Sequence, residues 1–261
     1  MHKLKAGIIF DSWIMFKRCL LTSLRNPEAL LVATIVPFFL MFLFGNVFGN
    51  IANVGTFNYI DFIVPGIILQ SIGQSSQYSA MNVTADMTKG IIDRFRTMSV
   101  SKAAVLAGHA GAGVVRNTIS TITIIATALI LGFRPQGSLL DWLVITGLLT
   151  LVNIAISLLA VMCGLLSKTV EGSSGLMLPL FILPFISSGF VPVNSLDGGI
   201  KWFAEIQPMT PVIDSFRALT LDLPLGNSLW IAVAWCVGII IAAFTLSIQI
   251  YKRRTDFPAN C

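Results

Sequence analysis

The sequence contains little charge. Of its 261 residues only 11% are Asp, Glu, Lys or Arg, whereas soluble domains carry about 25%. Hydrophobic residues make up 55% of the chain, and its mean hydropathy is +0.84. A chain of this composition cannot cover its surface with polar side chains. The composition therefore excludes a soluble protein and predicts one that lipid surrounds.

Several motifs of catalysis and metal binding are absent. No GxxxxGK[ST] segment is present to bind nucleotide phosphates, and no HExxH segment to bind zinc. The four cysteines are scattered and form no CxxC pair. Only two histidines occur, and neither follows the GSSG segment at 172–175, where an intramembrane serine protease would need its base. The sequence predicts no catalytic residue, no metal site and no cofactor in this chain.

Long apolar runs are abundant. A membrane-spanning helix needs about 20 mostly apolar residues, because each residue rises 1.5 Å through a hydrocarbon core of about 30 Å. An open sheet cannot cross, since its unpaired backbone groups would find no water there. The runs predict an all-α polytopic membrane protein with six transmembrane helices. They cover residues 29–48, 59–81, 105–131, 139–166, 172–190 and 229–250.

The basic residues predict the orientation. If the N-terminus is inside, the cytoplasmic segments hold 13 of the 17 Lys and Arg residues, the outer segments hold three, and Arg116 lies within a run. Because Lys and Arg concentrate in cytoplasmic loops, this predicts a multi-pass plasma-membrane protein with both termini in the cytoplasm. The net charge of +5 is spread over these segments and forms no patch that would bind nucleic acid.

Residues 1–26 precede the first run and form a separate element. Apolar residues recur there at helical spacing, and polar residues share the opposite face. This pattern predicts an amphipathic helix lying in the cytoplasmic interface, and Asn26-Pro27 then ends it. The apolar face consists of Ile9, Trp13, Phe16, Leu20 and Leu24.

Two connections are unusual for a simple bundle. Segment 86–104 is charged and is divided by Gly90. It suits docking of a soluble partner, and anchoring on the membrane surface by its basic residues explains it equally well. Segment 190–225 is broken by prolines yet contains several large apolar residues. It predicts a re-entrant outer hairpin between helices five and six, because irregular backbone is tolerated where protein covers it.

Two groups of motifs resemble a known family. They are GIIDRFR at 90–96 with AVLAGH at 104–109, and SGFVP at 188–192 with QPMTPV at 207–212 and RAL at 217–219. Together they resemble type 2 ABC transporter permeases, in particular the daunorubicin-resistance type of drug exporter permease. The resemblance covers nearly the whole chain. It implies one transmembrane domain over residues 1–261, with an interfacial helix, a cytoplasmic coupling region and a re-entrant outer segment.

The resemblance also implies partners and site residues. Two permease subunits pair in this family, as a homodimer or a heterodimer, and each docks on a soluble ATPase subunit that binds ATP and Mg. By position, the coupling contact consists of Asp86, Lys89, Gly90, Asp93, Arg94 and Arg96. The outer re-entrant gate consists of Gly189, Pro192, Pro208 and Pro211.

Polar residues also occur within the spans. Gln70, Gln74 and Gln77 share one helical face, with Asn82 beyond them. They predict either a lining of the translocation pathway or a seam between subunits, because amides also hydrogen-bond between helices. Arg116 inside an apolar run predicts an interfacial arginine, or one that snorkels or finds a carboxylate.

The resulting functional hypothesis is a permease subunit that exports drugs, antibiotics or other amphipathic compounds, driven by a separate ATPase. Export of a polysaccharide or lipid-linked polymer by the same transporter class is one alternative. An ion-driven carrier is another, and it would require carboxylates in mid-span. Asp61, Asp141 and Glu171 lie instead at the ends of runs.

Overall fold

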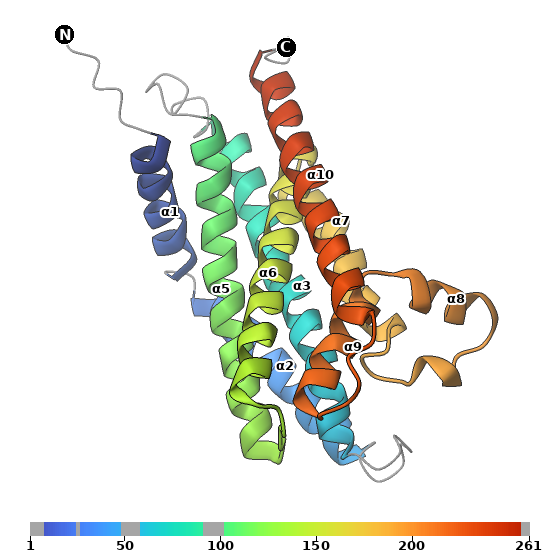
Figure 1. Ribbon diagram of the computed structural model, residues 1–261. Helices are drawn as coiled ribbons and strands as arrows, with labels where there is room; N and C mark the ends of the chain where they lie inside the picture. The colour runs from blue at the N-terminus through green and yellow to red at the C-terminus, as the bar shows by residue number, and fades with distance from the viewer. Residues whose placement is uncertain (1–7, 25–26, 48–57, 91–101, 257–261) are drawn as a thin grey trace.

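The computed structural model describes residues 8–24, 27–47, 58–90 and 102–256 (Figure 1). Helices make up most of this part of the chain, and it contains no strand. The predicted all-helical architecture is thereby confirmed. The α-helices are α1 (Ile8–Leu24), α2 (Pro27–Val47), α3 (Tyr59–Thr88), α5 (Lys102–Leu131), α6 (Leu139–Leu166), α7 (Val170–Ile182), α8 (Gly198–Ile206), α9 (Met209–Thr220) and α10 (Ser228–Asp256), and the short 3-10 helices are η1 (Leu183–Ile186) and η2 (Val193–Ser195).

Three of the described helices are long and apolar enough to cross a membrane. These are α5, α6 and α10, and they coincide with the third, fourth and sixth predicted runs. Two shorter apolar helical stretches, Ile35–Gly45 and Val170–Ile186, fall in the first and fifth runs. The helices support a membrane protein, and the count of six crossings stays a prediction.

Helix α3 lies at the centre of the bundle. It packs against α2, α5, α6, α7 and α9, and Ile63, Ile67 and Ile72 on it are fully buried. A Cβ added to Gly73 would lie 2.7 Å from the carbonyl oxygen of Leu180 on α7. Small residues at such contacts let helix backbones approach closely. The polar residues of α3 are thus largely enclosed by other helices.

Helix α1 lies alongside α5 (Figure 1). Met15 packs on Gly108, where an added Cβ would lie 2.6 Å from the Cβ of Met15. The helix that the sequence predicts is therefore present, and its buried face carries Met15, Cys19 and Ser23. Trp13, from the predicted apolar face, is 61% exposed. The small residues of α5 accept one side of α1 and leave this aromatic residue facing outward.

The helix ends fall into two groups in Figure 1. The start of α1, the end of α3, the start of α5 and the end of α10 share one end of the bundle, and the turn between α5 and α6 lies at the other. An even number of crossings would give this arrangement. Which end faces the cytoplasm stays a prediction.

The segment after η1 breaks into short helices at its prolines, as the sequence predicts. Pro192 precedes η2, and Pro208 precedes α9. Helix α9 packs into the bundle with Phe216 buried in its core, whereas α8 projects from the bundle with Trp202 exposed (Figure 1). The depth of these helices in a membrane stays a prediction.

Candidate functional site

The predicted coupling residues begin at the end of α3. Asp86 lies in its last turn, and Lys89 and Gly90 follow. Gly90 has a φ of +64°, a left-handed conformation that glycine adopts most readily, so the backbone leaves the helix there. The other predicted coupling residues, Asp93, Arg94 and Arg96, lie outside the described residues.

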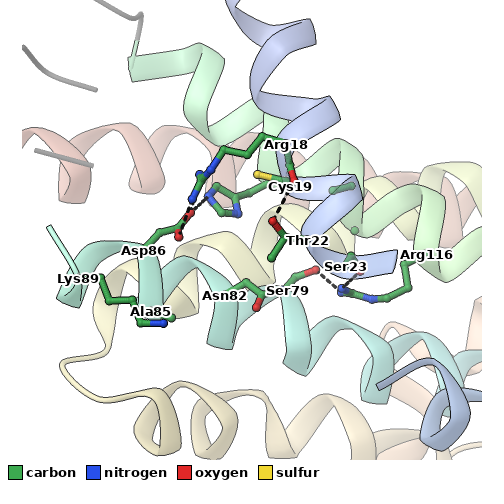
Figure 2. A pocket seen from close by; sticks show the side chains of 13 residues that line it. Arg18, Cys19, Thr22, Ser23, Ser79, Asn82, Ala85, Asp86, Lys89 and Arg116 are labelled. Atoms are coloured by element: carbon green, nitrogen blue, oxygen red, sulfur yellow. Dashed lines mark hydrogen bonds and ion pairs between the residues drawn. The ribbon is translucent and has the colours of Figure 1, made fainter. Parts of the chain in front are cut away.

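Asp86 connects α3 to two other helices. Arg18 of α1 donates two hydrogen bonds to its carboxylate, from Nη1 to Oδ2 at 2.9 Å and from Nη2 to Oδ1 at 3.0 Å. Nε2 of His109 on α5 lies 3.3 Å from Oδ2 of Asp86 (Figure 2). Bidentate Arg–carboxylate pairs are among the stronger charged contacts in proteins. The end of α3 is thus fastened to both α1 and α5.

These neighbours set the ionisation of Asp86, which lies beyond the predicted second span. Burial raises the pKa of Asp86, but His109 and Arg18 lower it by more, so its pKa falls below the ordinary value. The hydrogen bonds that Arg18 donates raise the pKa of Arg18. Asp86 is therefore ionised at neutral pH and paired.

A polar cavity lies between α1, α3 and α5 (Figure 2). Its volume is about 110 Å³. Asn82, which the sequence groups with the glutamines of α3, lines this cavity, as do Asp86 and Lys89. The structure thus places one predicted pathway residue beside two predicted coupling residues.

Arg116 lies at the inner end of this cavity and is only 4% exposed. Its Nε donates to Ser75 Oγ at 3.1 Å, Nη1 donates to Ser23 Oγ at 2.9 Å, and Nη2 donates to Ser75 O at 2.8 Å and Ser79 Oγ at 2.5 Å. The sequence predicts an interfacial arginine, or one that snorkels or finds a carboxylate. Among the described residues no carboxylate pairs with Arg116, and hydroxyl groups of α1 and α3 hold it inside the bundle. Its depth in the membrane stays a prediction.

The three glutamines all lie on α3, as predicted. Gln70 is fully buried, and both polar atoms of its amide have no partner among the described residues; the same holds for Oε1 of Gln74. Gln77 is half-buried. A buried polar group without a partner costs about 1–3 kcal/mol. Gln70 is enclosed by other helices, whereas Gln74 and Gln77 are partly exposed and can reach a ligand or a second subunit, so lining and seam both stay predictions.

Of the predicted gate residues, Gly189 contacts α3 directly, and Pro208 and Pro211 lie at the start of α9, which also packs against α3. A Cβ on Gly66 of α3 would lie 2.8 Å from the Cα of Gly189, so the two backbones touch here. Pro211 is buried in the first turn of α9, where Pro208 is the N-cap residue. Pro192, by contrast, is only partly buried and lies on the side of η2.

Arg217 fixes α9 at this contact, and sequence reasoning missed it. Its Nη2 donates to the carbonyl oxygens of Ser188 at 2.6 Å and Phe62 at 3.1 Å. Its guanidinium carbon lies 3.8 Å from the centre of the Phe62 ring, a cation–π geometry. Ser188 also donates to Asp214 at 2.6 Å. The RAL motif at 217–219 was the available signal.

The serine partners of Arg116 were missed as well. Ser75 and Ser79 stand at i and i+4 in the second predicted run, so they share a helix face. That spacing was a usable signal. The third partner, Ser23, lies on α1 and is 93 residues away in sequence.

Comparison with known proteins gives the family. A family model described as ABC-2 type transporter matches residues 11–221. The daunorubicin resistance ABC transporter permease protein DrrB1 of Streptomyces coeruleorubidus is 25% identical over 240 residues, which are 91% of this chain and 84% of that protein.

Two further relatives align over similar lengths. The probable doxorubicin resistance ABC transporter permease protein DrrC of Mycobacterium tuberculosis is 27% identical over 247 residues, which cover 94% of this chain and 89% of that protein. The inner membrane transport permease YadH of Escherichia coli is 24% identical over 249 residues, which cover 90% and 94%. Because the family model matches most of the chain, the protein belongs to the ABC-2 type transporter family, as a membrane transport subunit without its own ATPase.

Proposed function

We propose that the chain is the permease subunit of an exporter that moves drugs, antibiotics or other amphipathic compounds out across the plasma membrane. One observation carries this proposal. Relatives named for daunorubicin and doxorubicin resistance align over 91% and 94% of the chain. The unpartnered buried amides of α3 support it, because they offer unused hydrogen-bonding groups inside the bundle.

In the proposed assembly, the subunit crosses the membrane six times with both termini in the cytoplasm. Two copies pair as a homodimer, and each docks on a separate ABC ATPase subunit that binds ATP and Mg. The shared location of the start of α1 and the end of α10 supports an even number of crossings (Figure 1).

The ATPase contact in this proposal is the coupling region 86–104. Asp86, Lys89 and Gly90 form its beginning at the end of α3, and Asp93, Arg94 and Arg96 continue it. Because Asp86 is paired with Arg18 and lies against His109, a displacement of this region would move α1, α3 and α5 together. The coupling residues would thus act on several helices at once.

The pathway in this proposal follows Gln70, Gln74 and Gln77 along α3. Its outer end is closed by the gate residues Gly189, Pro192, Pro208 and Pro211. The tight contact of Gly66 with Gly189 supports a closing role, because it leaves no space between α3 and the segment after η1.

Drug efflux tests the substrate class. A strain lacking this chain is expected to retain more daunorubicin, and its growth should be inhibited at lower drug concentrations than that of the parent strain. Loss of a surface polymer with unchanged drug tolerance would instead support polymer export. Efflux that persists without any ABC ATPase but stops when the ion gradient collapses would support an ion-driven carrier.

The coupling region is tested by a matched pair of glycine variants. Gly90 and Gly226 both have positive φ, of 64° and 54°, and an added Cβ at either position would have no atom of the described residues within 4 Å. Valine at either position costs about 1–2 kcal/mol of backbone strain. Gly90→Val is expected to abolish drug-stimulated ATP hydrolysis by the co-purified complex, whereas Gly226→Val keeps it. Failure of any ABC ATPase to co-purify with the chain would contradict the proposal.

A further inference from the structure

The charges around the cavity between α1, α3 and α5 do not balance. Arg116 is buried, and among the described residues no carboxylate lies within ion-pair distance of it. Its four hydrogen bonds go to three serine hydroxyls and one carbonyl oxygen. These dipoles satisfy donors but supply no negative charge, and a buried charge without a counter-charge is costly. A mobile anion would supply the missing charge.

The lining of the cavity as a whole carries more positive than negative side chains. Arg18, Lys89 and Arg116 contribute three positive charges, and Asp86 contributes the one carboxylate in the lining. Asp86 is already paired with Arg18. Lys89 and Arg116 lie at opposite ends of the cavity (Figure 2), and Asn82 lies between them. The lining therefore combines two cations with an amide that can donate a hydrogen bond.

The size of the cavity limits what it can hold. Its volume is about 110 Å³, and a cavity needs only about 10–15 Å³ on this measure to hold one water molecule. A tetrahedral oxyanion therefore fits, and guanidinium groups bind phosphate oxygens well. We propose that this cavity binds a phosphate-type oxyanion, with Arg116 at its inner end, Asn82 at its side and Lys89 at its rim.

The surface next to the cavity favours a phospholipid as the source of the phosphate. Ile14 and Leu21 are 46% and 44% exposed, and they lie four residues before and three residues after Arg18, so all three are neighbours on α1. An acyl chain lying on this apolar strip would place its headgroup at the mouth of the cavity. Free phosphate would use the same donors without contacting the strip.

Binding to the purified subunit tests the proposal. Affinity is measured by thermophoresis in detergent for phosphatidylglycerol, for phosphatidylcholine, and for inorganic phosphate against chloride at equal ionic strength. We expect the wild type to bind phosphatidylglycerol about tenfold more tightly than phosphatidylcholine, and Arg116→Gln to lose about tenfold in affinity. Lys89→Gln, at the exposed rim, keeps the fold and is expected to lose a few-fold. Arg253→Gln, an exposed cation at the same end of the bundle, is the control and is expected to bind as the wild type does.

Each outcome decides the matter. Selective binding of phosphatidylglycerol that weakens in both Lys89→Gln and Arg116→Gln supports the site with a lipid as its ligand. Selective binding of inorganic phosphate with the same dependence supports the site with a soluble ligand. No selectivity in either measurement, or wild-type affinity in either of these two variants, would overturn the proposal. Drug efflux plays no part in this test, so its result is independent of the proposed substrate.

Discussion

The pair formed by Arg18 and Asp86 offers a quantitative test of how α1 is held. We consider Arg18→Gln, Asp86→Asn and the double variant. Both side chains are partly buried, with 32% and 15% of their surface exposed, and they meet through two hydrogen bonds of 2.9 and 3.0 Å. The charge–charge contact is lost in each single variant and also in the double variant. The departure of the double variant from the sum of the two single effects therefore measures the energy of this contact.

The structure sets the expected magnitude. Exposed ion pairs contribute about 0.2–1 kcal/mol, and hydrogen bonds to charged groups contribute about 1.5–3 kcal/mol. A partly exposed bidentate pair should lie between these, so we expect a coupling energy of about 1 kcal/mol. Asp86→Asn should destabilise more than Arg18→Gln, because it also leaves His109 without the carboxylate that lies 3.3 Å away.

Two measurements check this expectation. The free energy of unfolding in mixed micelles gives the double-mutant cycle. Maleimide labelling of Cys19, which is buried between α1 and α5, reports whether α1 leaves the bundle; the other cysteines are replaced by alanine. Labelling should become faster in each single variant. The control cycle combines Arg18→Gln with Asp141→Asn at the opposite end of the bundle, and its effects should add.

A coupling energy of zero would refute the reasoning. So would a Cys19 labelling rate that is the same in the wild type and in Asp86→Asn. Either result would mean that the ion pair does not hold α1, which would then depend on its packing on α5 and the hydrogen bond from Arg116 to Ser23.

Three further predictions follow. Gly73→Ala should lower the free energy of unfolding by about 1–3 kcal/mol, because its Cβ would lie 2.7 Å from the carbonyl oxygen of Leu180. The control Gly147→Ala, which has open space around the added Cβ among the described residues, should be neutral or stabilising by up to about 1 kcal/mol. Equal changes in the free energy of unfolding in micelles would contradict this prediction. Gln70→Leu should leave stability unchanged or higher, because it removes a buried amide without partners among the described residues, and a loss of stability would contradict this. Drug efflux should fall in the same variant if the amide lines the pathway, and unchanged efflux would mean that it does not. The pKa of Asp86 is lowered in the folded protein, so its contribution to the free energy of unfolding is complete above the unfolded pKa of about 4 and is lost as the pH falls further. The difference in melting temperature between the wild type and Asp86→Asn should therefore be constant from pH 7 to 5 and shrink below about pH 4. A decline that already begins at pH 6 would contradict the assignment.

The helices that the sequence predicted best are those that one rule determines. Residues 139–166 were predicted as a span, and α6 covers the same residues. The run 105–131 differs from α5 only at its beginning, where α5 includes Lys102. A long apolar run that crosses the bilayer must be helical, and its length is set by the thickness of the bilayer, whatever the helix packs against. Neither prediction required knowledge of tertiary contacts.

The side of α1 that meets the bundle could not be predicted in the same way. The hydrophobic pattern identifies the apolar face that includes Trp13, but packing is decided by which surface of α5 is available. Gly108 makes that surface flat enough for Met15. The match depends on two helices more than 70 residues apart in sequence, and periodicity within either helix carries no information about it.

Arg116 shows the same limit for the candidate site. An arginine in an apolar run predicts snorkelling or a carboxylate, because these are the usual ways to reduce the cost of its charge. The structure uses Ser23, Ser75 and Ser79 instead, at 93, 41 and 37 residues from Arg116. Serine is ambiguous in a sequence, since its hydroxyl also bonds to its own helix backbone. Only the meeting of three helices converts these serines into a guanidinium site.

The contacts of α1 also indicate where the bundle can change shape. Met15 packs on α5, Arg18 pairs with α3, and Ser23 accepts a hydrogen bond from Arg116, which itself bonds to α3. Packing, an ion pair and a shared hydrogen-bond donor thus join α1, α3 and α5, and separating them would break all three. The contact of Gly66 with Gly189 is also held by hydrogen bonds, because Arg217 donates to the carbonyl oxygens of Phe62 and Ser188. Opening between α3 and the segment after η1 would therefore have to break the bonds of Arg217, and Arg217→Gln should ease this opening without changing the contacts of α1. Export should then change in Arg217→Gln while the labelling of Cys19 stays as in the wild type, and unchanged export would place the moving contact elsewhere.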